Sequence, residues 1–404
     1  MLRRWPLLIT LVSLLSWGTW RTLHDAGHPY GDLSRGKFTD HVSHLNTTRL
    51  FARVGLDLYR RPIDTHARPL TEEEKLALPK DIDPKGPQRE VLVVEGWPID
   101  KPLVASWTGR PRMHPPGDHV LVGPVALLYH RTSLSFTDAN RLLILLFLVY
   151  AHIAVYVVLD TWARATRSRL LGPGLLVSAL VCLEAVHWSL EGFYEPIMIA
   201  PLLLMARALA TRRWLAAGLF YAIAVTIHFR ALFFMPWAFA ALAGAVTTRA
   251  WKDWRGWDWV ALAATAILVA ISATVFLLLW PTLRSLPIEH NPASWTAHGD
   301  PQARRALLAM AIAAGLVLAW SRAWIDVLVL AWMTVMFVSL RESYEWDLLT
   351  AMAWLPAPVI GLEGGGMRAV RREEAVKAAR LVFMMFAGVM LFRNDLIPMW
   401  LRQL

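Results

Sequence analysis

The sequence has a single cysteine and few charged residues for its length. Cys182 is the only cysteine among 404 residues, so the chain has no internal disulfide framework and no thiolate metal site. Only 18% of the residues are charged, against roughly a quarter in soluble globular proteins. A soluble domain has too little polar surface to hide the apolar remainder, so these shortages exclude an ordinary soluble fold.

Apolar residues are abundant and are arranged in long runs. They make up 56% of the chain, and the runs are close to the ~20 residues that a helix needs to cross a ~30 Å hydrocarbon core. Tryptophan is over-used at 21 residues, and its amphipathic ring suits the headgroup layer at the ends of such runs. Tryptophans in this position are Trp188, Trp237, Trp251, Trp254, Trp280, Trp320 and Trp324. We therefore predict an integral membrane protein.

The runs predict an all-α membrane fold of about eleven transmembrane helices. The basic flank Met1–Arg4 and the apolar core Trp5–Trp20 indicate a first helix at 1–21. No small-x-small cleavage site follows it, which favours an uncleaved signal anchor over a signal peptide. A polar loop covers 22–138, and a polytopic helical domain covers 139–404. The remaining crossings are expected at 141–159, 171–189, 193–210, 214–229, 231–247, 258–280, 306–321, 324–340, 346–362 and 379–397.

The distribution of charge predicts the orientation. The net charge is +10, and the cations fall in alternate short gaps between the runs, which marks those gaps as cytoplasmic. They include Arg164, Arg167, Arg169, Arg207, Arg212, Arg213, Arg249, Lys252, Arg255, Arg322, Arg368, Arg371, Arg372, Lys377 and Arg380. This placement favours contact with anionic lipid headgroups over nucleic acid. We expect a multi-pass protein of a bacterial cytoplasmic (inner) membrane, with a cytoplasmic N-terminus and the 22–138 loop outside.

The loop carries two helix candidates separated by an irregular stretch. His41–Leu58 has amphipathic spacing, and Asp118–Tyr129 is a short apolar helix candidate. The residues between them, 62–113, are punctuated by proline and glycine, with a short strand suggested at Val91–Val94. A loop this long is usually functional or disordered.

Ionisable residues gather at the predicted outer ends of the helices. Such groups are costly at membrane depth, so each is a candidate functional residue. They are Asp40, His41, His44, Glu184, His187, Glu191, Glu195, His228, Arg230, Arg341, Glu342, Glu345 and Asp347. The structural alternative is salt bridging between helix ends, for example Arg341 with Glu345 at i,i+4.

Three motifs in this order carry a resemblance to a known family. The first is Lys37–His41 continuing to Phe51–Pro62, the second is Arg112–Gly117 followed by an apolar helix, and the third is Leu215–Arg230 with Pro236 beyond it. Together, over about residues 30–240, they resemble GT-C-type membrane glycosyltransferases. More narrowly, they are similar to the bacterial polyprenyl-phosphate-mannose-dependent mannosyltransferases. Two departures are His114, in the place of an aromatic residue, and Glu191–Glu195, in the place of a Gly-Asn or Gly-Gln pair.

The resemblance implies a fold, a reaction and a set of site residues. Two loop helices would lie on the membrane, and a sugar would pass from a polyprenyl-phosphate donor to a glycan, lipid or protein acceptor outside, with inversion. Asp40 would be the catalytic base, and Arg230 with His228 would bind the donor phosphate. The substrate-binding residues would be His41, His114, Glu191 and Glu195. No cofactor and no metal site are predicted.

Other interpretations of the same residues stay open. Asp40 can cap a helix, Arg230 can reach outer headgroups as a snorkelling side chain, and His114 can belong to a rigid Pro-Pro turn. His41 and His44, at i,i+3, could hold a divalent metal, although no HExxH motif is present. The alternative functions are a transporter or flippase for a lipid-linked or anionic solute, and a scaffold whose loop docks partners. Charges at the outer end, away from the bilayer midplane, argue against a transporter.

Overall fold

The structure is a computed structural model of the 404-residue chain. It describes residues 115–134, 136–164, 192–285, 301–339, 350–361 and 367–392. It also describes part of 44–60, the segments 65–69, 90–94 and 103–104, and the positions 12, 16, 185 and 189.

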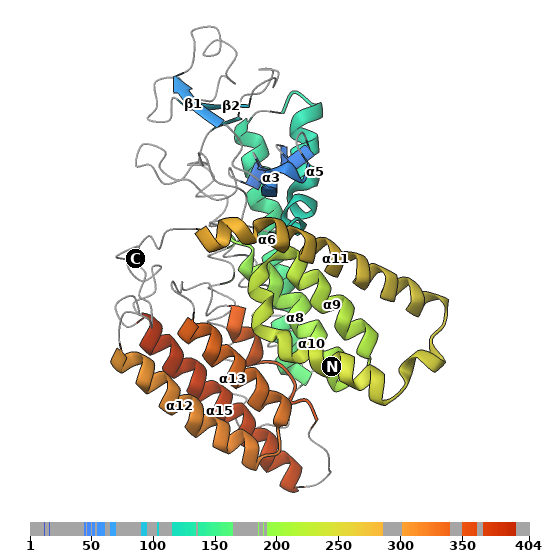
Figure 1. The fold of residues 1–404 in the computed structure, drawn as a ribbon, viewed down its shortest axis with the longest axis vertical. Helices are drawn as coiled ribbons and strands as arrows, with labels where there is room; N and C mark the ends of the chain where they lie inside the picture. The colour runs from blue at the N-terminus through green and yellow to red at the C-terminus, as the bar shows by residue number, and fades with distance from the viewer. Residues whose placement is uncertain are drawn as a thin grey trace.

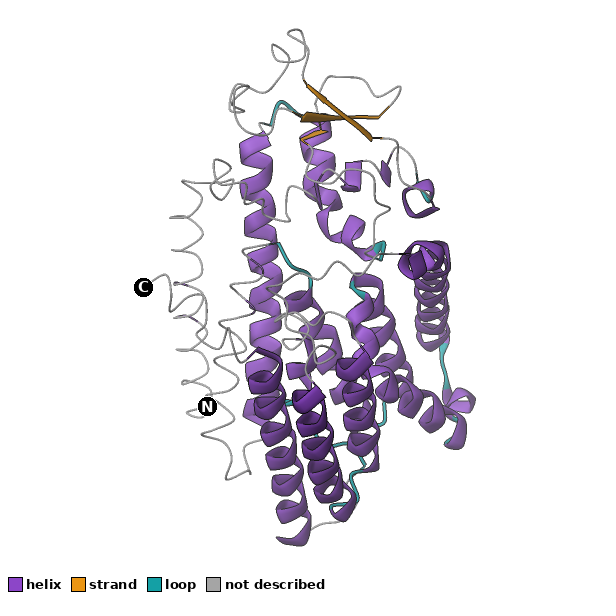
Figure 2. Cartoon of the chain, turned by 60° about the vertical axis from the view of Figure 1, so that its left-hand side comes forward, coloured by secondary structure: helices purple, strands orange, loops and turns teal. Residues whose placement is uncertain are grey.

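A small sheet stands at one end of the molecule, beyond the helices (Figure 2). Its strands are β1 (Thr65–Pro69), β2 (Glu90–Val94) and β3 (Leu103–Val104), in the order β1-β2-β3 with antiparallel pairing. Thr65 pairs with Val94 at one end of the first ladder. The strand predicted at Val91–Val94 is therefore confirmed, and it is the centre of a sheet that lies within the loop.

The rest of the described chain is helical (Figure 1). Three stretches are long and apolar enough to cross a membrane, namely Arg141–Trp162, Phe229–Thr247 and Gly256–Leu279. The helices are α3 (Asp57–Arg60), α5 (Gly117–Arg131), α6 (Phe136–Arg164), α8 (Glu195–Ala210), α9 (Trp214–Ile227), α10 (Met235–Thr247), α11 (Gly256–Ser285), α12 (Pro301–Trp320), α13 (Trp324–Ser339) and α15 (Met367–Phe392). Apolar helices of this kind fit a membrane protein, and the total of about eleven crossings stays a prediction.

One predicted crossing is not a continuous helix where the structure describes it. Of the expected run 346–362, residues 350–361 form a short 3₁₀ helix, η5 (Met352–Trp354), followed by turns. Pro356 and Pro358 supply no backbone N–H for an α-helix, and Gly361 has a positive φ of 80°. The prediction rested on apolar composition alone. Pro356, Pro358 and Gly361 prevent a continuous α-helix here, although the run is apolar.

The closely spaced crossings at 214–229 and 231–247 form a tight hairpin. Helix α9 ends at His228, whose backbone is extended, and the 3₁₀ helix η3 (Phe229–Phe234) leads into α10. The open ends of the hairpin are tied together, because the Trp214 Nε1–H donates to Thr248 Oγ1 at 3.1 Å. The same indole lies against Gly244, where a Cβ would come within 2.7 Å of the ring.

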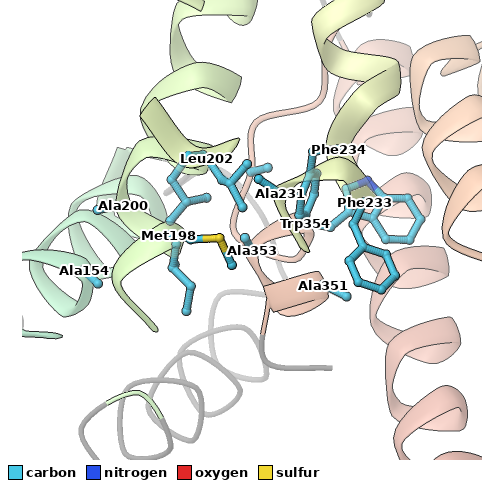
Figure 3. Packing of buried hydrophobic residues seen from close by; sticks show 14 of the residues in the cluster. Ala154, Met198, Ala200, Leu202, Ala231, Phe233, Phe234, Ala351, Ala353 and Trp354 are labelled. Carbon is cyan, nitrogen blue, oxygen red and sulfur yellow. The ribbon is translucent and has the colours of Figure 1, made fainter. Parts of the chain in front are cut away.

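The centre of the molecule is an apolar core that joins α8, η3 and η5 (Figure 3). Met198 and Leu202 of α8 lie near Phe233 and Phe234 of η3, and Trp354 of η5 lies beside them. All five side chains are buried. Because η3 is bound into this core, the residues beside it are held on a rigid support.

The start of α5 touches the end of α9 through backbone alone. A Cβ on Gly117 would lie 2.3 Å from the carbonyl oxygen of Thr226 and 3.0 Å from the nitrogen of Ile227. Backbone cannot move aside as the end of a flexible side chain can, so only glycine fits here. This contact fixes α5 on the end of the α9–α10 hairpin where the chain turns from α9 into η3.

We expect Gly117→Ala to destabilise the protein by about 1–3 kcal/mol, the usual cost of overpacking a tight contact. Gly123→Ala, on the same helix, is the matched control, because nothing lies within 4 Å of its added methyl group and alanine is the better helix former. Thermal unfolding in detergent measures both. Equal midpoints for the two variants would contradict the close packing of α5 on α9.

Candidate functional site

Three ionisable residues meet where the first turn of α8 faces the break after α9. Arg230 donates from its guanidinium to the Glu195 carboxylate, and His228 Nε2 lies 3.8 Å from Glu195 Oε1. The sequence predicted each of these residues as a site residue. In the structure the three side chains lie together, although Glu195 and Arg230 are 35 residues apart in the sequence.

Glu195 is the buried member of the cluster. It is the first residue of α8 and is followed by Pro196, which suits a helix start because the proline ring presets φ and needs no N–H donor there. A carboxylate at a helix N-terminus is also stabilised by the free N–H groups of the first turn. Its side chain is only 3% exposed, so the positive charge of Arg230 is what makes burial of this carboxylate tolerable.

Arg230 sits on a turn that is fixed on both sides. The backbone N–H of Arg230 donates to His228 Nδ1 at 3.1 Å, and the N–H of Ala231 donates to the His228 carbonyl. From α13, the Trp332 Nε1–H donates to the Leu232 carbonyl at 2.8 Å. Since Nδ1 of His228 accepts, a neutral imidazole carries its proton on Nε2, the atom that faces Glu195.

The cluster is most accessible at Arg230. Its side chain is 22% exposed, against 11% for His228 and 3% for Glu195. A guanidinium carries more N–H donors than one carboxylate can use, in a planar fork that matches phosphate oxygens. The arrangement is therefore suited to hold an anionic group beside the fixed Glu195–Arg230 pair.

His44, in the described part of the first loop, contacts this region. His44 Nε2 and the carbonyl oxygen of Gly192 are 2.7 Å apart, which makes a hydrogen bond three residues before Glu195. The His44 ring also packs on Tyr194, with ring centroids 4.2 Å apart, and stacks at 5.9 Å on Phe147 of α6. His44 is thus anchored next to the cluster, and Asp40, four residues earlier in the sequence, falls outside the described residues.

Thr48 and Phe51 of this loop segment, together with Tyr59 of α3, are fastened to α5 through His119. The Tyr59 hydroxyl lies 2.9 Å from His119 Nε2, and the Thr48 hydroxyl lies 3.2 Å from His119 Nδ1. The Phe51 ring stacks on the imidazole at 4.2 Å. The pairing of Tyr59 with His119, 60 residues away, carried no local signal in the sequence.

The structure describes part of the predicted site. Glu195, His228 and Arg230 lie together as described, whereas Asp40, His41, His114 and Glu191 fall outside the described residues. Glu195 takes a specific place that the sequence did not assign, because its carboxylate binds Arg230. This makes Glu195 a positioning residue for the guanidinium.

A second buried polar cluster is shared by α13, α15 and η5, and the sequence did not indicate it. Arg380 of α15 binds Asp326 of α13, and Trp354 Nε1–H donates to the same carboxylate oxygen at 2.7 Å. Arg380 also donates to the carbonyls of Ala357 and Trp354. The Asp326 and Arg380 side chains are 1% and 0% exposed, so this cluster holds the fold together and offers no open site.

The described residues around Glu195 thus form a partly accessible cationic site at Arg230 and the contacts that hold it in place. Comparison with known proteins adds no relative, since no family model, no curated protein and no solved structure matches this chain.

Proposed function

We propose that this protein is a membrane glycosyltransferase of the GT-C type, which moves a sugar from a polyprenyl-phosphate donor to an acceptor outside a bacterial cytoplasmic membrane. The observation that carries the proposal is the Arg230 guanidinium, held on a rigid turn by buried Glu195, close to the hydrogen bond between His44 and Gly192. The three motifs that resemble this family contribute the same parts, a loop segment with an acid and a hairpin tip with a cation.

The reaction would proceed by a single inverting displacement. The acceptor hydroxyl attacks the anomeric carbon, a new C–O bond forms, and the bond from the anomeric carbon to the phosphate oxygen breaks. The hydroxyl proton passes to the Asp40 carboxylate as general base, and polyprenyl phosphate leaves with the bonding electron pair. Arg230 binds the phosphate, whose negative charge grows as it leaves.

The local electrostatics fit an anionic leaving group. Glu195 neutralises part of the charge of Arg230 and sets its position, while the partly exposed guanidinium keeps a face toward solvent. His228 adds an Nε2 donor beside it. Charge-assisted hydrogen bonds of this kind are about twice as strong as neutral ones.

The pair Glu195→Gln and Glu195→Gln/Arg230→Gln tests the role of Arg230. Replacing Arg230 alone would leave a buried carboxylate without its cation and would confuse folding with binding. The double variant keeps two polar side chains that can bond to one another. Relative to Glu195→Gln, we expect it to bind undecaprenyl phosphate about 10–150-fold more weakly, the value of a lost charge-assisted hydrogen bond.

Tryptophan fluorescence of the purified protein during titration with undecaprenyl phosphate measures this affinity. Arg131→Gln, an exposed arginine at the end of α5, is the control and should leave the affinity unchanged. Equal affinities in Glu195→Gln and in the double variant would remove Arg230 as the phosphate ligand.

A transport assay separates the proposal from its rival. In vesicles that contain the purified protein and a labelled polyprenyl-phosphate sugar, a glycosyltransferase forms a new glycosidic bond to acceptors from the cell envelope. A transporter or flippase would move the labelled lipid or solute across the bilayer with no bond formed. Movement without transfer would therefore replace the glycosyltransferase by a transporter.

A further inference from the structure

Three turns between consecutive helices share one backbone conformation and one sequence pattern. They are 211–214, 248–251 and 321–324, which read Thr-Arg-Arg-Trp, Thr-Arg-Ala-Trp and Ser-Arg-Ala-Trp. In each, the arginine adopts a left-handed conformation, with φ of 57° at Arg212, 51° at Arg249 and 61° at Arg322. These are the only non-glycine residues with positive φ among those that the structure describes.

The arginine stands where a helix normally ends in glycine. In the first turn the N–H of Arg213 donates to the Ala208 carbonyl and the N–H of Arg212 donates to Leu209. In the third turn Ala323 and Arg322 repeat the pattern on Leu318 and Ala319. This is a Schellman ending, whose left-handed position favours glycine because a Cβ is strained there. Arginine at this position therefore makes each of the three turns less stable than glycine would.

Helix electrostatics do not account for the choice. A cation stabilises the C-terminus of a helix equally well from the last helical turn, as Arg207 can in α8. Arg213, next to Arg212, also supplies a cation, from a backbone with negative φ. The left-handed position must therefore offer something besides charge. All three arginines are exposed, as are Thr211 and Arg213 in the first turn and Thr248 in the second. In the third turn Arg322 is exposed while Ser321 and Ala323 on either side of it are buried.

A tryptophan follows each arginine by two residues. Trp251 is 42% exposed and Trp324 is 62% exposed, while Trp214 is partly buried and ties the first turn to the second through Thr248. Tryptophan is the residue that settles at the headgroup level of a bilayer. All three turns also lie in gaps that the charge pattern assigns to the cytoplasmic side, where the leaflet is negatively charged.

We propose that the three arginine turns bind the phosphate headgroups of anionic phospholipids in the cytoplasmic leaflet. Each turn projects one guanidinium beyond the end of its helix, and the neighbouring indole sets its depth at the headgroup layer. The inference is independent of the glycosyltransferase proposal. The Arg212 and Arg249 turns lie at the opposite ends of α9 and α10 from Arg230, and the Arg322 turn joins α12 to α13.

The variant Arg212→Gly/Arg249→Gly/Arg322→Gly tests the proposal, since glycine suits the turn and removes only the guanidinium. In detergent without lipid, we expect its thermal unfolding midpoint to equal or exceed that of the wild type. Added dioleoylphosphatidylglycerol should raise the midpoint of the wild type and leave the variant almost unchanged. The affinity for this lipid should fall about fivefold per arginine, on the order of a hundredfold in all.

Arg131→Gln/Arg304→Gln/Arg305→Gln is the matched control, because it also removes three exposed arginines and should retain the response to phosphatidylglycerol. Phosphatidylcholine and inorganic phosphate serve as probes of the ligand, and neither should raise the wild-type midpoint. An equal response to phosphatidylglycerol in the glycine variant and the wild type would overturn the proposal. So would a lower midpoint of the glycine variant without lipid, which would show that the arginines serve the turn itself.

Discussion

Arg380→Met is expected to cost at least about 5 kcal/mol of stability, enough to prevent accumulation of folded protein. Breaking a buried ion pair typically costs ~3–5 kcal/mol, because the remaining charge stays in a medium that solvates it poorly. Here Asp326 would be that remaining charge, with a side chain 1% exposed. Backbone carbonyls that lose a donor while buried add ~1–3 kcal/mol each.

Those carbonyls make the arginine more important than its charge alone. Arg380 donates to the carbonyl oxygen of Trp354 at 3.0 Å and of Pro358 at 3.4 Å, and also to that of Ala357. They belong to the end of η5 and to the turns after it, where no α-helix continues among the described residues 355–361. Non-helical backbone at membrane depth is tolerated only where protein satisfies it, and Arg380 does so for this segment.

Two further variants separate the contribution of the Asp326–Arg380 ion pair from that of the hydrogen bonds to the carbonyls. Asp326→Asn keeps an acceptor for Trp354 and keeps the arginine on its carbonyls, so it should cost clearly less than Arg380→Met. Arg371→Met, an exposed arginine on the same helix α15, should be close to neutral. Thermal unfolding and the folded fraction after extraction from membranes measure all three. Equal losses for Asp326→Asn and Arg380→Met would mean that the ion pair alone matters.

The sequence predicted elements well where the signal is local. Apolar runs placed α8, α9 and α13 within a few residues of their ends, and the apolar segment Val91–Val94 suggested the strand that is found there. The apolar composition of 346–362 outweighed Pro356 and Pro358 in that prediction, and the described part of this run is not a helix. Length and hydropathy measure the cost of burial, but they do not show whether each backbone group has a partner.

Contacts between distant residues were the part that the sequence could not supply. Arg380 looked like one more cytoplasmic cation that faces headgroups, yet its side chain is fully buried against Asp326, 54 residues away. Glu195 and Arg230 were both predicted as site residues because charges at helix ends are costly. Their pairing depends on how α8 and η3 meet in the core, which no local pattern encodes.

Asp40→Asn is expected to reduce kcat of sugar transfer by about 10²–10⁴-fold, the usual contribution of a positioned general base. The carboxylate and the amide have nearly the same shape, and asparagine caps a helix about as well as aspartate. A role as helix cap alone would therefore leave kcat unchanged. Asp40 lies four residues before His44, whose ring is hydrogen-bonded to Gly192 beside the Arg230 cluster.

Substitutions of Asp40 and of Arg230 should affect different steps, namely sugar transfer and donor binding. Because a base acts on the acceptor, Asp40→Asn should still bind undecaprenyl phosphate as the wild type does, whereas loss of Arg230 weakens that binding. Asp138→Asn, a half-exposed carboxyl at the start of α6 that pairs with Arg141, is the matched control and should keep full activity. Transfer of labelled sugar from undecaprenyl-phosphate-mannose to cell-envelope acceptors measures kcat. Wild-type transfer by Asp40→Asn would mean that another group takes the proton, and the role of the loop acid would be reduced to capping its helix.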